Sequence, residues 1–199
     1  MNCDRIARWY RWFEYAGFGR ALEHRREAFL SEVSTVRRAL VLGDGDGRAL
    51  AALLAAAPQA QIDYVDLSAR MLDLARRRAG SVRVAYHHGD ALTVPLPAAE
   101  YDLIVTHFFL DCFDHEDQAR LAARVTRAAT PQARWLVSEF RKPGLLVRAL
   151  YLFFRAATGL KTQRLVDHHP LLQRFGYSLV RSNEAWGGLL ASELWVHVE

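Results

Sequence analysis

Residues 38–48 read RALVLGDGDGR, a short apolar run that ends in three alternating glycines. An apolar run bounded by glycine is typical of a strand buried inside a parallel sheet. Glycines directly after such a strand permit a tight turn and let the backbone approach a ligand with no side chain between them. The Ala- and Leu-rich segment 48–57 stops before Pro58, which predicts a helix. We therefore expect a strand, a ligand-binding loop and a helix in succession.

The alternation of strand and helix continues along the rest of the chain. Apolar runs predict further strands, at residues 61–65, 82–87, 101–106, 134–139, 178–181 and 190–198. Helical spacing predicts further helices, at residues 68–78, 116–129, 143–157 and 165–175. This order indicates a Rossmann-like, doubly wound α/β fold, with a mostly parallel seven-stranded sheet and helices on both faces. Such sheets bind ligands at the carboxyl ends of their strands.

The bulk composition is that of a soluble globular protein, with 51% hydrophobic and 24% charged residues among 199. No apolar run reaches the roughly eighteen residues that cross a bilayer, and we read no export signal, so a cytoplasmic location is expected. The net charge of +4 does not favour a nucleic-acid partner, because the basic residues are spread over several predicted helices. Cys3 and Cys112 form no CxxC spacing, so no disulfide framework or zinc site is indicated.

Two further motifs place carboxylates at the ends of neighbouring predicted strands. Asp66 lies 19 residues after Gly47, where an acidic side chain can accept hydrogen bonds from both ribose hydroxyls of an adenosine. Asp90 follows the third strand, where it can accept from the exocyclic amine of adenine while Ala91 leaves space for the ring. Alone, the Gly89-Asp90 pair is as often a turn as a site. Together with the glycine loop they predict a site for an adenosine-containing ligand.

The glycine loop does not have the spacing of a dinucleotide-binding loop. The pattern GxGxxG requires glycine or alanine at its last position, where this sequence has Arg48 or Leu50, depending on the first glycine chosen. Asp44 and Asp46 would also repel a pyrophosphate, whereas they suit ammonium and sulfonium groups. The glycine loop therefore disfavours an NAD(P)-dependent oxidoreductase, which is kept as an alternative enzyme class.

Over residues 36–140 the chain resembles a class I S-adenosylmethionine-dependent methyltransferase, with LGDGDG, YVDLSARML, HHGDA and YDLIVTHFFLDCF in the usual order. The resemblance implies that these segments hold the methionine part, the ribose, the adenine and the reaction centre of S-adenosyl-L-methionine, respectively. The residues assigned to cofactor binding are Gly43, Asp44, Gly45, Gly47, Asp66, Leu67, Asp90, Ala91 and Thr106.

One position departs from the family pattern. The family usually has an acidic residue two places before the first glycine of the loop, and Val41 stands there in this chain. Asp44 or Asp46 is the alternative partner for the cofactor's ammonium group. The departure also leaves open a catalytically degenerate member that binds the cofactor and serves as a partner subunit.

The segment after the fourth predicted strand bears on the acceptor. It lacks the Asn or Asp followed by Pro-Pro-aromatic that is frequent in enzymes of the family that methylate nucleobase amines, which favours a small-molecule acceptor. His107 is the candidate catalytic residue, as a general base, with packing against the cofactor as the alternative. No metal is expected, because Asp111, Asp114 and His115 are explained by a helix start and His168-His169 by a turn.

The chain is expected to form a single domain, residues 1–199. Its expected parts are an N-terminal helical lid, a cofactor-binding core, a helical insertion that acts as a second lid, and closing strands, at residues 1–35, 36–140, 141–175 and 176–199. Aromatic residues are frequent in both lids, which predicts a planar or lipophilic acceptor for O- or C-methylation; the alternatives are core packing and peripheral membrane contact by residues 145–160. Methyltransferases of quinone biosynthesis share this layout. The sequence does not specify the oligomeric state.

Overall fold

The structure, a computed structural model, describes residues 10–142 and 165–198 together with Asp4, Gly144, Val147 and Leu152. The helix expected at 143–157 and most of the insertion expected to form a second lid lie outside the described residues. So do aromatic residues of the two expected lids, namely Trp9, Tyr151, Phe153 and Phe154, and the side chains of Tyr10 and Phe13.

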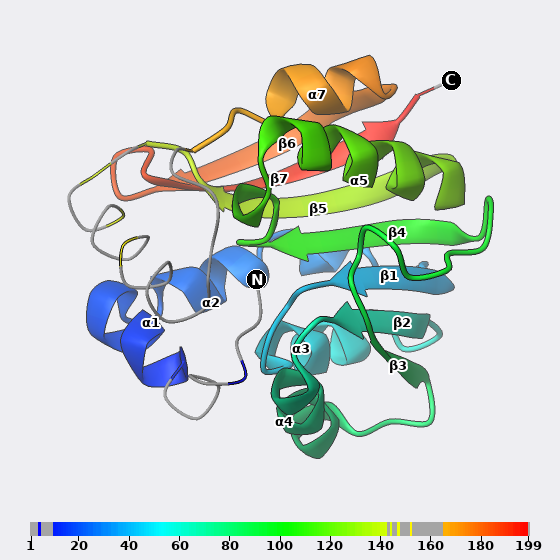
Figure 1. Ribbon diagram of the computed structural model, residues 1–199, viewed down its shortest axis with the longest axis horizontal. Helices are drawn as coiled ribbons and strands as arrows, with labels where there is room; N and C mark the ends of the chain where they lie inside the picture. Colours follow the sequence, from blue (N-terminus) through cyan, green and yellow to red (C-terminus); the bar gives the residue numbers. More distant parts are fainter. Residues whose placement is uncertain are drawn as a thin grey trace.

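A seven-stranded sheet forms the centre of the molecule (Figure 1). Its strands are β1 (Arg38–Leu42), β2 (Gln61–Asp66), β3 (Val84–His88), β4 (Tyr101–His107), β5 (Ala129–Phe140), β6 (Tyr177–Ala185) and β7 (Leu190–His197). Their order is β3-β2-β1-β4-β5-β7-β6, and β7 runs antiparallel to both of its neighbours. The predicted Rossmann-like α/β fold is confirmed, with a sheet that is mixed rather than wholly parallel.

The antiparallel strand follows from the short connection between β6 and β7. A parallel pair needs a long crossover, whereas adjacent strands joined by a tight turn must run in opposite directions. Gly187 and Gly188 have φ angles of +64° and +81°, which side-chain-bearing residues rarely adopt, and they form this turn. The chain therefore reverses and inserts β7 between β5 and β6.

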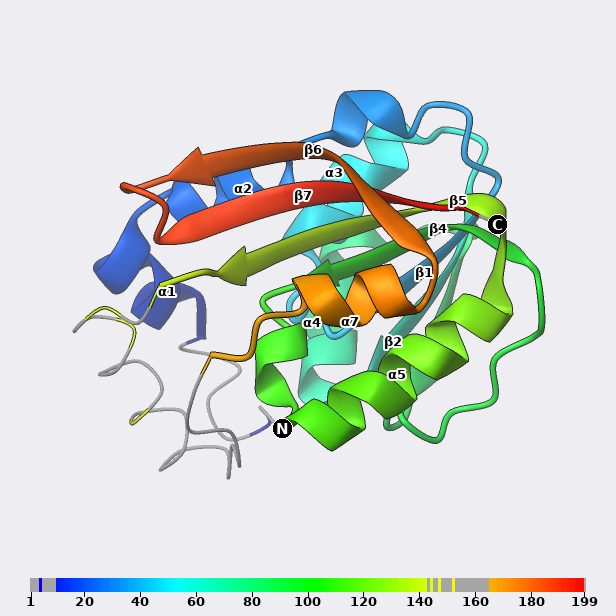
Figure 2. The same cartoon turned by 90° about the horizontal axis from the view of Figure 1, so that it is seen from above.

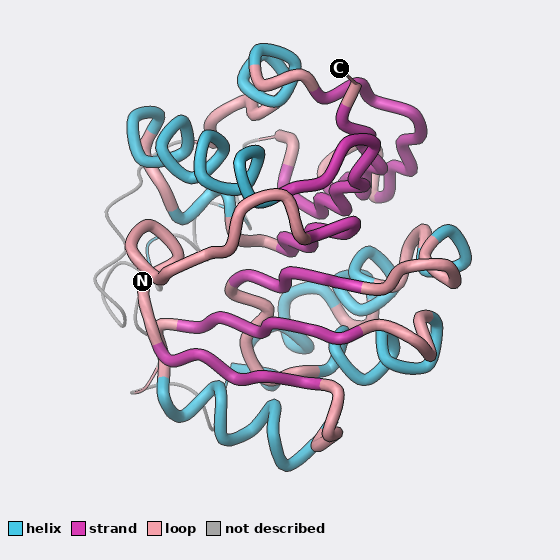
Figure 3. Tube along the Cα trace, turned by 90° about the vertical axis from the view of Figure 1, so that its right-hand side faces the viewer, coloured by secondary structure: helices cyan, strands magenta, loops and turns pink. Residues whose placement is uncertain are grey.

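Helices cover both faces of the sheet (Figures 2 and 3). They are α1 (Tyr10–Phe18), α2 (Ala21–Arg26), α3 (Arg48–Ala56), α4 (Ala69–Ala79), α5 (His115–Ala128) and α7 (His169–Arg174). Leu40 of β1 packs in the core under α5 and α7, whereas Val41 packs in the core under α3 and α4. A strand that is buried on both faces has a continuous apolar sequence, and for this reason β1 could be predicted from the sequence. No helix among the described residues is long and apolar enough to cross a membrane.

Several elements differ from the sequence expectation, and strand β6 is longer at both ends than the predicted 178–181. The helical spacing of the N-terminal stretch is divided at Gly19, whose φ of +55° ends α1 before α2 begins. The helix expected at 165–175 is shorter, because α7 has Pro170 in its first turn and the residues before it are not helical. Strand β5 starts at Ala129, earlier than expected, and passes Pro131 with an irregular backbone at Gln132 (φ +60°).

A buried ion-pair network joins the N-terminal helices to the start of α3. The carboxylate of Glu14, only 4% exposed, lies 2.5 Å from the guanidinium of Arg26 and also contacts that of Arg48. Arg48 further pairs with Glu23 at 3.2 Å and with Asp46 at 2.9 Å. Burial alone would raise the pKa of Glu14, but the two guanidinium groups lower it below its ordinary value. The glycine loop and the N-terminal helices are thus held together by charge.

Replacing Glu14 by glutamine is expected to destabilise the fold by about 3 kcal/mol, because it removes the buried carboxylate that Arg26 and Arg48 share. The loss is measured as the difference in unfolding free energy from urea titrations at pH 7. The pKa of Glu14 is lowered on folding, so its stabilising effect is present at neutral pH and is lost as the pH falls through the folded-state pKa. The difference between the two proteins should therefore shrink in acid.

The matched control is Glu32→Gln, which breaks the exposed ion pair between Glu32 and Arg181. Surface pairs contribute less than about 1 kcal/mol, so this variant should remain close to the wild type. Equal losses for the two variants would contradict the structural role of the buried network.

Candidate active site

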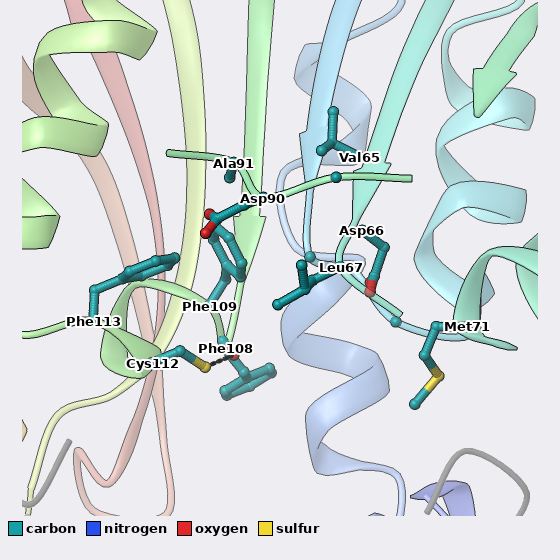
Figure 4. A pocket seen from close by; sticks show the side chains of 13 residues that line it. Val65, Asp66, Leu67, Met71, Asp90, Ala91, Phe108, Phe109, Cys112 and Phe113 are labelled. Carbon is teal, nitrogen blue, oxygen red and sulfur yellow. Dashed lines mark hydrogen bonds between the residues drawn. The ribbon is translucent and has the colours of Figure 1, made fainter. Parts of the chain in front are cut away.

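A pocket opens to solvent at the carboxyl ends of β1, β2, β3 and β4. Figure 4 shows its side chains converging from these strand ends and from the loop after β4. The described residues that line it are Gly43, Gly45, Val65, Asp66, Leu67, Met71, Gly89, Asp90, Ala91, Phe108, Phe109, Cys112 and Phe113. Two carboxylates and no basic side chain are among them, so the pocket favours a neutral or cationic ligand over a polyanion.

The glycine loop contributes backbone to one wall. Gly43 and Gly45 line the pocket and have φ angles of +63° and +71°, in the region that glycine adopts without strain. Gly47 does not line the pocket. A Cβ atom there would lie 2.6 Å from the Cα of Ala75, so Gly47 permits close packing of the loop on α4. Of the predicted glycines, two thus face the pocket and the third positions them.

Asp66 lies at the end of β2 with its carboxylate on the pocket wall. Its Oδ1 accepts a hydrogen bond from the backbone N–H of Ser68 at 2.8 Å, and Ser68 in turn caps α4. Burial raises the pKa of Asp66 to about 6, because the carboxylate is largely removed from water. Leu67 lines the same wall. The carboxylate of Asp66 is thus positioned to accept hydrogen bonds from hydroxyl groups of a ligand.

Asp90 and Ala91 follow β3 and lie across the pocket from Asp66 (Figure 4). The Oδ1 of Asp90 accepts from the backbone N–H of Leu92 at 2.9 Å, which fixes the side chain. Ala91 is 6% exposed and lines the pocket next to Asp90. The structure therefore brings together the predicted glycine loop, Asp66, Leu67, Asp90 and Ala91.

Three other predicted residues lie behind the pocket wall. The hydroxyl of Thr106 accepts from the indole N–H of Trp135 at 2.9 Å and faces the α5 side of the sheet. His107, 3% exposed, places its Nδ1 3.3 Å from the Oδ1 of Asp44, which is also buried. None of the three is among the residues that line the pocket. The catalytic role of His107 remains a prediction, with a buried carboxylate as its neighbour.

The aromatic wall of the pocket was not assigned from the sequence. Phe108, Phe109 and Phe113 line it from the loop after β4, and Phe108 has a φ of +52°. The ring of Phe109 packs directly on Gly43, since a Cβ on that glycine would fall 2.1 Å from the ring. Three phenylalanines within six residues could have indicated an aromatic wall. The sequence after a strand does not show, however, which of these rings face a ligand.

Glu139, at the end of β5, holds this aromatic loop in place and was also missed. Its Oε1 accepts from the backbone N–H groups of Phe109 at 3.0 Å and Leu110 at 2.8 Å. Burial raises the pKa of Glu139, and the nearby charge of Asp111 raises it further. The contact joins residues 30 positions apart in the sequence, and spacing patterns carry no signal for it.

A second polar cluster lies between α7 and the sheet. The ligand-type atoms of His168, His169 and Glu193 lie within 4.8 Å of one another. Burial alone would raise the pKa of Glu193, but hydrogen bonds from the two histidines and from Trp195 lower it to about 2. The guanidinium of Arg141 lies 2.5 Å from the same carboxylate. Glu193 thus already has a cation and several hydrogen-bond donors around it.

Comparison with known proteins agrees with this arrangement. Residues 39–132 match the family described as a methyltransferase domain. The demethylmenaquinone methyltransferase of Deinococcus radiodurans is 34% identical over 123 residues, which are 60% of this chain and 50% of that protein. The chain spans between 48% and 64% of the length of the curated relatives it matches.

Solved structures with the same fold include two further methyltransferases. The mitomycin 7-O-methyltransferase MmcR superposes with a TM-score of 0.70 at 20% identity, covering 95% of this chain and 57% of that one. The N-methyltransferase NodS from Bradyrhizobium japonicum WM9, in complex with S-adenosyl-L-homocysteine, superposes with a TM-score of 0.67 at 15% identity, over 90% and 89% of the two chains. The match over residues 39–132 and the curated relatives support the methyltransferase family predicted from the sequence, and the solved structures share its fold.

Replacing Asp66 by asparagine is expected to stabilise the unliganded protein by about 2 kcal/mol above pH 6, because the buried carboxylate is charged there. Folding raises the pKa of this carboxyl group to about 6, so the wild type loses stability as the pH rises from about 4 to 6. Urea unfolding of both proteins between pH 4.5 and 8 measures the difference. Asp73→Asn, at an exposed site on α4, should change stability by less than about 0.5 kcal/mol. A gap that widens toward acid would contradict the assignment.

Proposed function

We propose that this protein binds S-adenosyl-L-methionine in the pocket and transfers its methyl group to a small, planar or lipophilic acceptor, at oxygen or carbon. The observation that carries the proposal is the division of the pocket into two parts. Glycine backbone, Asp66 and Asp90 form one part, and Phe108, Phe109 and Phe113 form the other. The first part suits a polar, cationic nucleoside, and the second suits an apolar ring.

The buried groups at the site fit this cofactor. Asp66 offers its carboxylate to the ribose hydroxyls, and Asp90 offers an oxygen to the adenine amine, with the small side chain of Ala91 next to it. The Oδ2 of Asp44 is buried and has no hydrogen-bond partner among the described residues, so a positively charged group would satisfy it. The absence of basic side chains on the described pocket wall disfavours a pyrophosphate-containing cofactor.

S-adenosylmethionine supplies an electrophilic methyl group on a sulfonium. The residues of this chain contribute alignment and exclusion of water. Asp66 and Asp90 fix the nucleoside at two points, and the Phe108–Phe113 loop, held by Glu139, forms the wall where an acceptor can stack. His107, buried against Asp44, has no described contact with the pocket space, so we assign no base to the acceptor.

The acceptor class is the finer part of the proposal. The relative from Deinococcus radiodurans is named a demethylmenaquinone methyltransferase, and the aromatic wall of this chain would stack on a planar ring of that kind. We therefore propose a phenolic or enolic ring, with a quinol as the leading candidate and carbon as the methylated atom.

The N-terminal segment is proposed to act as a lid. Asp4 accepts a hydrogen bond from the hydroxyl of Ser68 at 2.6 Å and another from the backbone N–H of Arg70 at 3.1 Å. Both donors lie at the start of α4, and Ser68 is two residues after Asp66. Figure 1 shows α1 on the side toward which β1 and β4 point, the side where the pocket opens. Both contacts support a segment that covers the carboxyl edge of the sheet.

A catalytically degenerate partner subunit is the second candidate. Val41 in place of the usual acid and the ring of Phe109 packed on Gly43 are the observations that favour it. Cofactor binding without transfer to any acceptor would distinguish it from an enzyme.

The purified protein is expected to bind S-adenosylhomocysteine in titration calorimetry and to show no comparable affinity for NADH. Asp66→Ala should weaken binding by about 1.5–3 kcal/mol, the scale of a hydrogen bond to a charged acceptor. Asp90→Asn should also weaken it, with an unchanged unfolding temperature. Asp73→Asn is the control and should bind like the wild type. If Asp90→Asn lowers the unfolding temperature while affinity holds, the adenine assignment is wrong.

Methyl transfer is expected from S-adenosylmethionine carrying a labelled methyl group to a reduced 1,4-naphthoquinone. Mass spectrometry of the product then shows whether carbon or oxygen carries the label. Asp66→Ala should raise the cofactor KM, because the ribose loses its acceptor. Binding of S-adenosylhomocysteine with no labelled product from naphthoquinols, catechols or enols would favour the partner-subunit alternative.

A further inference from the structure

The ring of Phe108, which lines the pocket (Figure 4), lies against a guanidinium group from the N-terminal helices. The Cζ of Arg26 is 5.1 Å from the centre of that ring. We infer that Arg26 is a positioning residue for the acceptor, because it fixes a ring of the wall on which the acceptor stacks. The inference rests on the proposed function. It adds to the site a residue of α2 that is not among the described residues lining the pocket.

The first support is the attachment of α2 and of the aromatic loop to the same point of the sheet. The backbone N–H of Phe108 donates to the carbonyl of Ser138 at 2.6 Å, and the hydroxyl of Ser138 donates to the carbonyl of Arg25 at 2.9 Å. The hydroxyl of Ser192 on β7 donates to the same carbonyl of Arg25 at 2.8 Å. The carboxyl end of α2 is thereby fixed beside the first residue of the loop, which places Arg26 over the ring of Phe108.

The second support is the orientation of the guanidinium group. Its two terminal nitrogens bind the carboxylate of Glu14 at 2.5 and 3.3 Å. A planar guanidinium can pair with a carboxylate along its edge and still present its face to an aromatic ring. The side chain of Arg26 is 5% exposed, and a cation–π contact is stronger where water is excluded. The ion pair with Glu14 therefore holds the cation in place for Phe108.

The third support is the backbone of Phe108 itself. Its φ of +52° lies in the left-handed region, which is unfavourable for a residue that carries a side chain. The ring packs on Phe140, with 5.1 Å between the ring centres, and joins the core cluster that contains Phe18 and Leu22. These contacts and the cation of Arg26 together stabilise the unfavourable conformation, so the ring keeps one orientation toward the pocket.

The fourth support is the presence of a charge on the buried face of α2. This face consists of Leu22 and Arg26, one turn apart. Exchanging a buried ion pair for apolar side chains is often neutral or stabilising, so stability alone does not explain an arginine at this position. A cation that holds a ring of the acceptor wall does explain it.

The test measures two affinities by titration calorimetry. The probes are S-adenosylhomocysteine on the free protein, and 1-naphthol, a stable planar phenol, on the protein saturated with S-adenosylhomocysteine. Arg26→Gln should weaken 1-naphthol binding about three- to tenfold, the scale of a buried cation–π contact, and S-adenosylhomocysteine binding less than about twofold. Arg26→Lys retains a cation and should restore part of the loss. Arg25→Gln is the matched control on the same helix, because its guanidinium binds Asn183, and it should leave both affinities unchanged.

A double-mutant cycle separates positioning from a general loss of structure. Phe108→Leu should weaken 1-naphthol binding, and Arg26→Gln added to it should cost little more, because the ring through which Arg26 acts is gone. Added to Phe113→Leu, in the same wall, Arg26→Gln should cost its full factor. Thermal unfolding verifies that each variant is folded. If Arg26→Gln does not fold, Arg26→Met combined with Glu14→Gln carries the cycle, because it leaves no unpaired carboxylate.

Three results would overturn the inference: equal losses of both affinities in Arg26→Gln, no loss of either, or losses that add to those of Phe108→Leu. A wild type that binds S-adenosylhomocysteine but not 1-naphthol would contradict the proposed acceptor class, and the inference with it. A wild type that binds neither probe would contradict the proposed function as a whole.

Discussion

Negative charge buried around the glycine loop is the constraint on which the rest of this structure depends. Asp44, Asp46 and Asp66 lie close enough to act together on Tyr64, whose pKa is raised first by burial and then by these carboxylates. Tyr64 donates its hydroxyl to the carbonyl of Gly45 at 2.9 Å, so the loop is held by a group that stays protonated. The fold satisfies these charges unequally. Asp46 has two guanidinium groups, whereas Asp66 and Asp44 have only weak or partial partners.

The two sides of the pocket accordingly differ in polarity. The ends of β1, β2 and β3 supply carboxylates and glycine backbone, and the end of β4 supplies aromatic rings. The rings depend on Glu139, which reaches from the neighbouring strand β5 to the backbone of Phe109 and Leu110. A carboxylate here acts on backbone N–H groups instead of on a ligand. One side of the pocket is therefore prepared for a cation, and the other for an apolar surface kept in one position.

The sequence predicted the elements that are buried on both faces and the residues at their ends. Strand β1 was predicted directly before the glycines, where it lies, because a continuous apolar run followed by glycine is typical of a buried strand. Asp66 and Asp90 were found because the carboxyl ends of parallel strands meet at one edge. Thr106 and His107 could not be oriented, since the last residues of a strand alternate between faces and the sequence does not show which face the ligand uses. Thr106 turned toward Trp135, and His107 turned toward Asp44.

The connection between the loop and the N-terminal helices could not have been predicted either, and it changes how a lid would work. Glu14 is 34 residues from Arg48, and no local pattern pairs them. Arg48 binds Asp46 of the glycine loop with the same guanidinium that holds Glu14 and Glu23. A movement of α1 would therefore alter the charge balance around Asp46, the one loop carboxylate that is fully neutralised. If the N-terminal segment acts as the proposed lid, its opening is coupled through Arg48 to the charge on Asp46 of the glycine loop.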